Sequence, residues 1–352
     1  MSESKVKVSD PFGAASDEAL PTLVLALDPT AVKEEFKRGL PRLAGEAGQV
    51  LLKSIHVLRH KPGKRCVIAY DVRVEQPGHP RRKATILGKV RARRFGNEAY
   101  RLLDAIWNAG FKKRCADGVA VPEPVGVIPR FQMWLQRWVR GAASGALLAG
   151  PQGVALARRI AEAIHKLHRA GVPTERTHTM GDELRILHEC LPRVATSRPE
   201  LGSRLRRILE ACERLGTSVP EPKPCGIHRD FYPAQVLVDG TRMWLVDFDL
   251  YCQGDPGLDV GNFIGHLTEE SLRTFGDAAA WRDREQAMED RFVELTGQAV
   301  RASVRAYTTL TLVRHIYLST QFAERKAWTE RLVDLCEERL RDSYTRRAES
   351  LP

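Results

Sequence analysis

The 352-residue sequence predicts an α+β fold in two lobes, with strands gathered before about residue 140 and helices dominating after it. Two observations predict this division. Segments that alternate between apolar and polar residues are concentrated in the first part, whereas apolar residues at helical spacing fill the second. We therefore expect an N-terminal antiparallel sheet with one main helix, followed by a larger, mainly helical C-terminal lobe.

The N-terminal lobe is expected over residues 28–135, after a flexible segment over residues 1–27. Asp28 and Pro29 form an N-cap and first-turn pair for a short helix that ends at Lys37. The other elements expected in this lobe are strands at 50–59, 66–74 and 85–90, a polar loop at 76–83, and a helix at 97–109 that stops at Gly110.

The C-terminal lobe is expected over residues 142–352, beyond a strand at 131–139 and a crossover at 136–141. Its clearest helix covers residues 154–170, with Ile160, Ile164 and Leu167 on one face and Gly171 after its end. One hairpin interrupts the helices of this lobe. Apolar residues alternate over 236–246 around an Asp239-Gly240 pair, which is a strong signal for a tight turn.

Composition indicates a soluble enzyme of the cytoplasm. No run of about 18 uncharged apolar residues predicts a membrane span, and no basic start followed by an apolar stretch predicts a signal peptide. The seven cysteines include no Cys-x-x-Cys pair, which argues against zinc sites and disulfide frameworks.

The net charge of +11 is concentrated in the N-terminal lobe. Residues 53–114 contain 17 Lys and Arg against 4 Asp and Glu, whereas residues 258–352 contain 14 against 16. The basic region is either a solvated sheet surface or a surface that attracts a polyanion, such as a nucleoside triphosphate or nucleic acid. Nucleic-acid recognition usually adds exposed aromatic residues or a known module, and the sequence has neither.

The segment over residues 225–259 carries most of the functional signal. His228 stands two residues before Asp230, and Gln235 follows five residues later; beyond the hairpin comes Asp247. Because a hairpin folds back on itself, its two ends must meet. Two carboxylates and an amide oxygen at the same end suit phosphoryl transfer, in which one carboxylate accepts a hydroxyl proton while the other groups hold Mg²⁺ on a nucleotide.

This order of residues resembles the catalytic core of protein-kinase-like phosphotransferases. Gly254, Asp255 and Pro256, followed by Asp259, resemble the branch that contains aminoglycoside phosphotransferases and choline kinases. The resemblance implies a protein-kinase-like bilobal fold, ATP with Mg²⁺ as cofactors, GTP being left open, and a small-molecule hydroxyl as acceptor. Most relatives have Asn at the position of Gln235, whereas maltokinase-like members resemble this chain in having Gln.

The resemblance also implies roles for residues of the C-terminal lobe. Asp230 would be the catalytic base, and Arg229 would steady the transferring phosphate or simply lie on the surface. The metal ligands would be Gln235, Asp247 and, if a second metal binds, Asp249. The catalytic loop would be supported by His228, with a polar anchor from Asp259.

In the N-terminal lobe, Lys89 would neutralise phosphate charge and pair with Glu98, although their spacing is short and Arg91, Arg93 and Arg94 lie close in sequence. Lys64, in the turn between the first two strands, is a further candidate for phosphate contact. The hinge over 136–141 would offer backbone groups to the base. Gln136 and Trp138 are its candidate nucleotide contacts.

Alternatives remain beside the small-molecule kinase, whose acceptor would be an amino sugar, a choline-like alcohol or a sugar. They are a protein kinase, a nucleotide-binding regulatory module without turnover, and an RNA-associated protein that uses its basic lobe; a salt-titrated binding assay would separate the last. His165 and His168, three apart on a helix, are interpreted as structural rather than metal-binding. The acceptor and the oligomeric state do not follow from the sequence.

Overall fold

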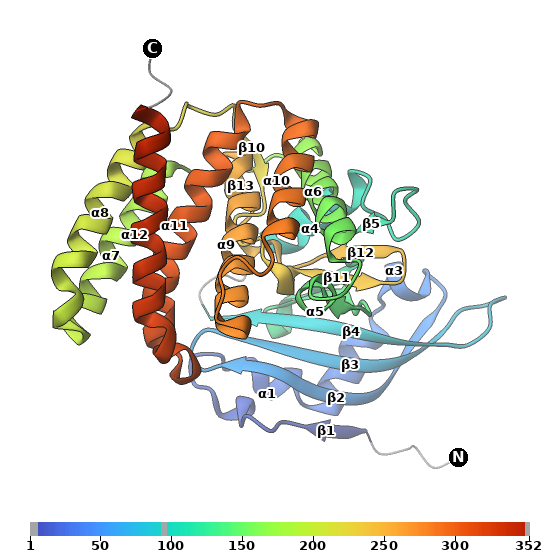
Figure 1. Ribbon diagram of the computed structural model, residues 1–352. Coiled ribbons are helices and arrows are strands. Elements are labelled where there is room, and N and C mark those ends of the chain that lie inside the picture. Colours follow the sequence, from blue (N-terminus) through green and yellow to red (C-terminus); the bar gives the residue numbers. More distant parts are fainter. Residues whose placement is uncertain (1–5, 93–96, 349–352) are drawn as a thin grey trace. The chain divides into compact units, whose positions relative to one another are not determined.

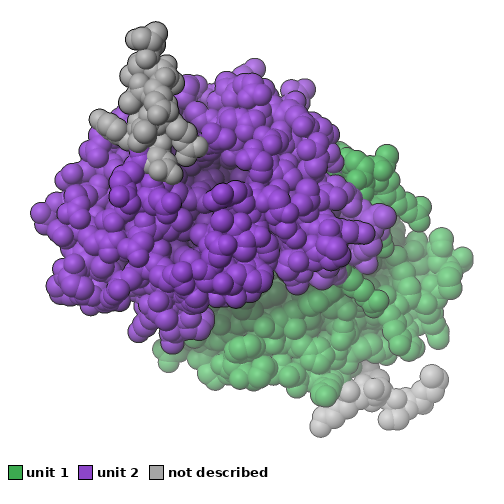
Figure 2. Space-filling view, in the orientation of Figure 1, with its two compact units in different colours: residues 1–140 green, residues 141–352 purple. Residues whose placement is uncertain are grey.

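The computed structural model describes residues 6–92 and 97–348, with side chains to residue 341 (Figure 1). The chain divides into two compact units, residues 1–140 and 141–352, which Figure 2 shows in different colours. The division falls inside the range 136–141, where the sequence analysis places the hinge.

Unit 1 is built on a six-stranded sheet in the order β1-β2-β3-β4-β7-β6. The short edge strand β1 runs parallel to β2, and the other neighbours are antiparallel. The strands are β1 (Lys7–Ser9), β2 (Gln49–Lys61), β3 (Arg65–Glu75), β4 (Arg82–Arg91), β6 (Pro124–Ile128) and β7 (Met133–Arg137). The predicted polar loop at 76–83 is shorter than expected, because pairing with β3 extends β4 back to Arg82.

The helices of unit 1 are α1 (Leu23–Ala26), α2 (Pro29–Lys37), α3 (Pro41–Ala44) and α4 (Glu98–Asn108), and β5 (Val119–Ala120) also falls in this unit. As predicted, Asp28 caps α2: its carboxylate accepts hydrogen bonds from the backbone N–H groups of Thr30 (3.0 Å) and Ala31 (3.3 Å).

Residues 6–27, which we expected to be flexible, are instead folded. Leu20 and Leu23 are buried in the core of unit 1, and the Tyr70 hydroxyl donates to the Ala26 carbonyl (2.9 Å). Asp17 accepts from the Gly63 N–H (2.9 Å) at the turn between β2 and β3. The segment contains no element long enough to show a period, so its burial depends on contacts with the distant sheet.

Unit 2 is mainly helical, as predicted. Its helices are α5 (Ser144–Leu148), α6 (Gly153–Arg169), α7 (Met180–Ser197), α8 (Gly202–Thr217), α9 (Pro256–Phe275), α10 (Arg282–Thr296), α11 (Val300–Gln321) and α12 (Thr329–Ala348). Short strands pair between them: β10 (Cys225–Ile227) with β13 (Cys252–Gly254), β13 with β9 (Thr177–His178), and β11 (Val236–Asp239) with β12 (Arg242–Leu245) and β8 (Ala142–Ala143).

Helices α9 and α11 pack closely because α9 presents glycines to its neighbour. A Cβ atom at Gly257 would lie 1.8 Å from the Ser303 Oγ, and one at Gly261 would lie 2.6 Å from the Tyr307 Cβ. This contact fixes the start of α9, which carries Asp259. No helix in the described part of the chain is long and apolar enough to cross a membrane.

Candidate active site

The loop over residues 228–235, here called the catalytic loop, joins β10 to β11 and closes on Val246. The His228 Nε2–H donates to the Val246 carbonyl (2.9 Å), and the Val246 N–H donates to the Gln235 carbonyl (3.0 Å). Both ends of the loop are therefore bonded to the residue that precedes Asp247. The two ends of the β11–β12 hairpin therefore meet, as the hairpin signal predicts, and the convergence of the Asp230, Gln235 and Asp247 side chains there stays a prediction.

The hairpin itself has the expected register. Asp239 pairs with Arg242, so that Gly240 and Thr241 form the turn, and Gly240 has a φ of 58°. A positive φ is readily adopted by glycine, which explains the Asp-Gly signal in the sequence.

Asp259, near the start of α9, anchors the beginning of the catalytic loop. Its carboxylate accepts from the backbone N–H groups of His228 (2.8 Å) and Arg229 (2.7 Å), and from the His168 Nε2–H (2.8 Å). Asp259, His168 and His228 are all buried. Arg229 adopts a φ of 67°, which is unfavourable for a residue with a Cβ atom, so the bond to Asp259 holds its backbone in a strained conformation.

Asn262, one turn after Asp259, holds the middle of the loop. Its Nδ2–H donates to the Phe231 carbonyl (2.9 Å), and its Oδ1 accepts from the Arg314 Nη2–H (2.6 Å). Arg314 also donates to Glu183 Oε2 (3.2 Å), and the other Glu183 oxygen is 2.7 Å from His178 Nε2. Burial raises the pKa of the Glu183 carboxyl, but the hydrogen bond with His178 and the charge of Arg314 outweigh it and leave the pKa below its ordinary value.

Tyr232, also in the catalytic loop, stacks on His266 with ring centroids 4.8 Å apart. Burial and the nearby charges of Arg314 and Arg325 lower the pKa of His266 to about 3, so the ring is neutral at physiological pH. The loop is thus supported by a neutral aromatic contact on one side and by charged hydrogen bonds at Asp259.

The two acidic residues after the hairpin differ in their setting. Asp247 adopts a φ of 68°, one of three non-glycine residues in the described ranges with a positive φ, together with Gln132 and Arg229. Strained backbone is concentrated at functional sites, and two of these three residues lie there: Arg229 is in the catalytic loop and Asp247 follows Val246, on which the loop closes. Asp249 lies in a 3₁₀ turn (Phe248–Leu250), and its carbonyl accepts from the Arg176 Nη1–H (3.0 Å).

No group of three or more His, Cys, Asp or Glu residues in the described chain is arranged to hold a metal ion. Mg²⁺ in nucleotide sites usually takes one or two protein ligands and completes its shell with phosphates and water. The oxygen ligands that such a site uses are present on Gln235, which is buried, and on Asp247, which is partly exposed. These residues fit a nucleotide-bound magnesium ion.

The candidates from the N-terminal lobe lie on elements of unit 1. Lys89 lies on β4 opposite Trp134, with its Nζ 5.0 Å from the centre of that ring, and Glu98 begins α4. Arg93 and Arg94, between them, lie outside the described residues. The contacts proposed for Lys89 and Glu98 with a nucleotide stay a prediction.

The other unit 1 candidates lie in the β2–β3 turn and on the last strand. Lys64 lies in a turn that is bonded to Asp17 through Gly63. Gln136, on β7, is buried, whereas Trp138 is 41% exposed. Their contacts with a nucleotide also stay predictions.

Sequence reasoning missed three supporting residues, His168, Asn262 and Arg314. His168 is structural, as interpreted, but its partner Asp259 lies 91 residues away, and no spacing in the sequence pairs them. Asn262 carries a signal that could have found it, because it follows Asp259 by three residues and so projects from a neighbouring position on the same helix.

A model of the phosphotransferase enzyme family matches residues 88–295, more than half of the chain. The chain belongs to the phosphotransferase enzyme family. No curated protein matches it.

Two solved structures of kinases are similar to this chain in fold. A choline kinase from Cryptosporidium parvum Iowa II has a TM-score of 0.54 at 12% identity, over 91% of this chain and 97% of its own. A thermostable mutant of aminoglycoside phosphotransferase APH(4)-Ia has a TM-score of 0.51 at 16% identity, over 83% and 95%. The predicted α+β, kinase-like fold is therefore confirmed, as is the resemblance to this branch.

We expect that Asp259→Asn destabilises the protein and lowers its activity more than a substitution of His168. The variant places an amide where two backbone N–H groups need acceptors, so at least one buried donor loses its partner, at a cost of about 1–3 kcal/mol. Urea denaturation would measure the free energy of unfolding. His168→Leu, which removes one donor and leaves both backbone bonds, is the matched comparison; an equal loss in the two variants would show that Asp259 does not act through the loop backbone.

Proposed function

We propose that the protein transfers the γ-phosphoryl group of a nucleoside triphosphate to a hydroxyl group of a small molecule, in the presence of Mg²⁺. The observation that carries this proposal is the closure of the catalytic loop on Val246: both ends of the loop that contains Asp230 and Gln235 are bonded to the residue before Asp247. Membership of the phosphotransferase enzyme family supports the reaction class.

In the proposed reaction, Asp230 accepts the proton of the acceptor hydroxyl and orients its oxygen toward the phosphate. Gln235 and Asp247 hold the metal, which when bound would neutralise charge on the phosphates. Arg229, whose backbone N–H is bonded to Asp259, would steady the transferring phosphate. Lys89 and Lys64, from unit 1, would contact phosphates, and Gln136 and Trp138 would contact the base.

Both ATP and GTP are proposed as donors to test. Structures of the family with TM-scores of 0.50 include a ternary complex of APH(4)-Ia with AMP-PNP and hygromycin B, and a GDP and kanamycin complex of another aminoglycoside phosphotransferase. These ligands, with the choline kinase, suggest amino sugars and choline-like alcohols as the first acceptors to screen.

The direct test is a screen for nucleoside diphosphate release by the purified protein. Amino sugars, choline-like alcohols, sugars and nucleosides would each be offered with ATP and with GTP. We expect release above the background hydrolysis with at least one hydroxyl acceptor, and phosphorylated product by mass spectrometry. Nucleotide binding without release for any acceptor class would instead favour the regulatory module.

Gln235 is the specific feature that favours this second candidate, a nucleotide-binding module without turnover. If Gln235 is a working metal ligand, Gln235→Asn pulls its oxygen back by about one methylene and should lower turnover, most clearly at low Mg²⁺. If the site has lost turnover, restoring the residue common in the family should raise activity. We expect lower turnover in Gln235→Asn, because the other polar residues of the motif are present: His228, Asp230, Asp247 and Asp259. Turnover measured against Mg²⁺ concentration shows whether the variant loses or gains activity.

A further inference from the structure

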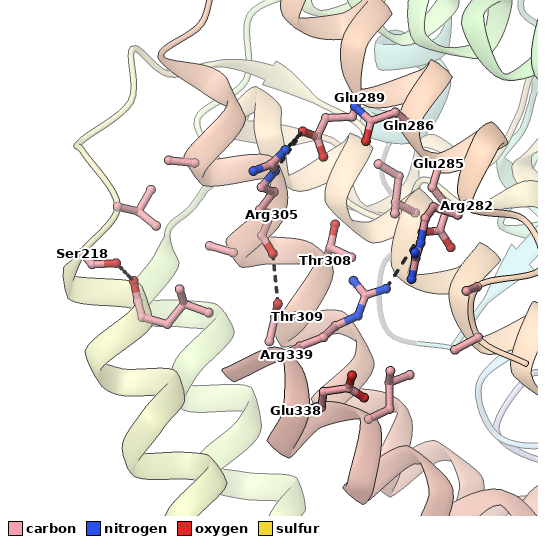
Figure 3. Close-up of a pocket in the computed structure, with 18 of the residues that line it drawn as sticks. Ser218, Arg282, Glu285, Gln286, Glu289, Arg305, Thr308, Thr309, Glu338 and Arg339 are labelled. Atoms are coloured by element: carbon pink, nitrogen blue, oxygen red, sulfur yellow. Dashed lines mark hydrogen bonds and ion pairs between the residues drawn. The ribbon is translucent and has the colours of Figure 1, made fainter. Parts of the chain in front are cut away.

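Unit 2 contains a cavity of about 730 Å³ between the end of α8 and the helices α9, α10, α11 and α12 (Figure 3). Pockets for small molecules commonly have volumes of about 300–1,000 Å³. No lining residue belongs to the catalytic loop or to the β11–β12 hairpin. The cavity is therefore distinct from the candidate active site.

The cavity has an apolar wall and a polar end. Leu215, in the last turn of α8, and Val219, just after that helix, form part of the apolar wall together with Ile264 of α9. At the polar end, Arg282 and Glu285 come from α10 and Arg339 comes from α12, and Figure 3 shows Arg339 reaching toward the other two. Such a lining suits a ligand with an apolar body and one polar group.

The carboxylates of the lining are mostly engaged by the protein. Glu289 accepts from the Arg301 Nη1–H (2.6 Å) and forms an ion pair with Arg305 (2.9 Å). Figure 3 shows this ion pair away from the Arg339 guanidinium group. Asp277 accepts from the Ala279 N–H (2.8 Å). Of the lining carboxylates, Glu338, at an exposed position of α12, has no hydrogen bond or ion pair with a described residue.

The arginines at the polar end retain unused hydrogen-bond donors. The Arg339 Nη2 lies 3.5 Å from the Thr268 hydroxyl and 3.9 Å from a Glu285 oxygen, both long contacts for a group with five N–H donors. The Arg282 side chain has no hydrogen bond or ion pair with any described residue. Burial raises the pKa of Glu285, which keeps its carboxyl group protonated to higher pH and weakens its competition for Arg339.

We propose that this cavity binds a small organic anion, with its carboxylate or phosphate group between Arg282 and Arg339 and its apolar body against Leu215, Val219 and Ile264. Guanidinium groups are well suited to these anions because their N–H donors form paired, charge-assisted hydrogen bonds. A ligand against Ile264 also contacts α9, the helix whose Asp259 and Asn262 hold the catalytic loop. The site does not depend on the proposed function.

The test is calorimetry and ligand-observed NMR on the full chain with four probes. Benzoate and phenyl phosphate carry the two anionic groups on the same ring, benzyl alcohol carries the ring without charge, and inorganic phosphate carries charge without the ring. The double variant Arg282→Gln with Arg339→Gln removes both guanidinium groups. Ala302→Phe, at an exposed position of α11 that lines the cavity, fills it without changing charge. Arg206→Gln, on an exposed face of α8 outside the cavity, is the matched charge control.

We expect at least one of the two ring anions to bind more tightly than benzyl alcohol and than inorganic phosphate. Both cavity variants should weaken that binding about tenfold or more, while Arg206→Gln leaves it unchanged. A preference between benzoate and phenyl phosphate would identify the natural anionic group. Equal binding of benzyl alcohol and the anions, binding that survives both cavity variants, or no binding of either ring anion would overturn the proposal. Because none of these measurements uses turnover, their outcome is independent of the phosphotransferase assays.

Discussion

Asp230→Asn should reduce turnover by a factor of about 10² to 10⁴, the usual contribution of a general base, while leaving nucleotide binding nearly intact. The amide occupies the same volume as the carboxylate but cannot accept the hydroxyl proton. The ends of the loop should keep their geometry, because hydrogen bonds of His228, Gln235 and Asp259 hold them in place. Steady-state kinetics with the acceptor found in the screen, together with calorimetric titration of the nucleotide, separate the two effects.

Asp239→Asn is the matched control for this prediction. Asp239 is an exposed residue of the β11–β12 turn, so its substitution removes the same charge from the same hairpin without touching the catalytic loop. We expect its activity to equal that of the unmodified protein. Comparable turnover in Asp230→Asn and Asp239→Asn would remove Asp230 from the role of base.

Local signals predicted the parts of the fold that depend on neighbouring residues. The cap at Asp28, the Asp239-Gly240 turn and the helix at 154–170 each depend on residues within one or two turns of one another, and each is present with nearly the expected bounds. The pairing of β11 with β12 could also be predicted, because a two-residue turn sets the antiparallel register of these neighbouring strands.

Contacts between distant segments could not be predicted in this way. Residues 6–27 have weak local signals and are ordered by burial against the sheet, and the three-residue strands β10 and β13 are too short to show a period. The hydrogen bond of His168 to Asp259 joins α6 to α9, and the link from Asn262 through Arg314 to Glu183 joins α9, α11 and α7. Such pairs follow from helix packing, which one sequence does not specify.

Replacement of Asp247 should abolish the Mg²⁺-dependent part of the affinity for nucleotide. Its carboxylate is the most direct anionic ligand that the site offers to the metal, and an amide or water in its place supplies no charge. Calorimetric titration of nucleotide with and without Mg²⁺ measures this part directly. Asp249→Ala, two residues later, tests in the same assay whether a second metal contributes.

The backbone conformation of Asp247 decides which variants separate metal binding from folding. At a φ of 68° a Cβ atom costs about 1–2 kcal/mol, and alanine lacks the short polar side chain with which aspartate can offset this strain, so a loss of affinity in Asp247→Ala alone would have two explanations. Glycine adopts this conformation without strain and removes the ligand, whereas asparagine tolerates it and retains an uncharged oxygen. We therefore expect Asp247→Gly to lose the Mg²⁺ effect with stability preserved, and Asp247→Asn to retain a small part of it. Unchanged Mg²⁺-dependent binding in Asp247→Gly would mean that Asp247 is structural and that the hairpin does not deliver a metal ligand.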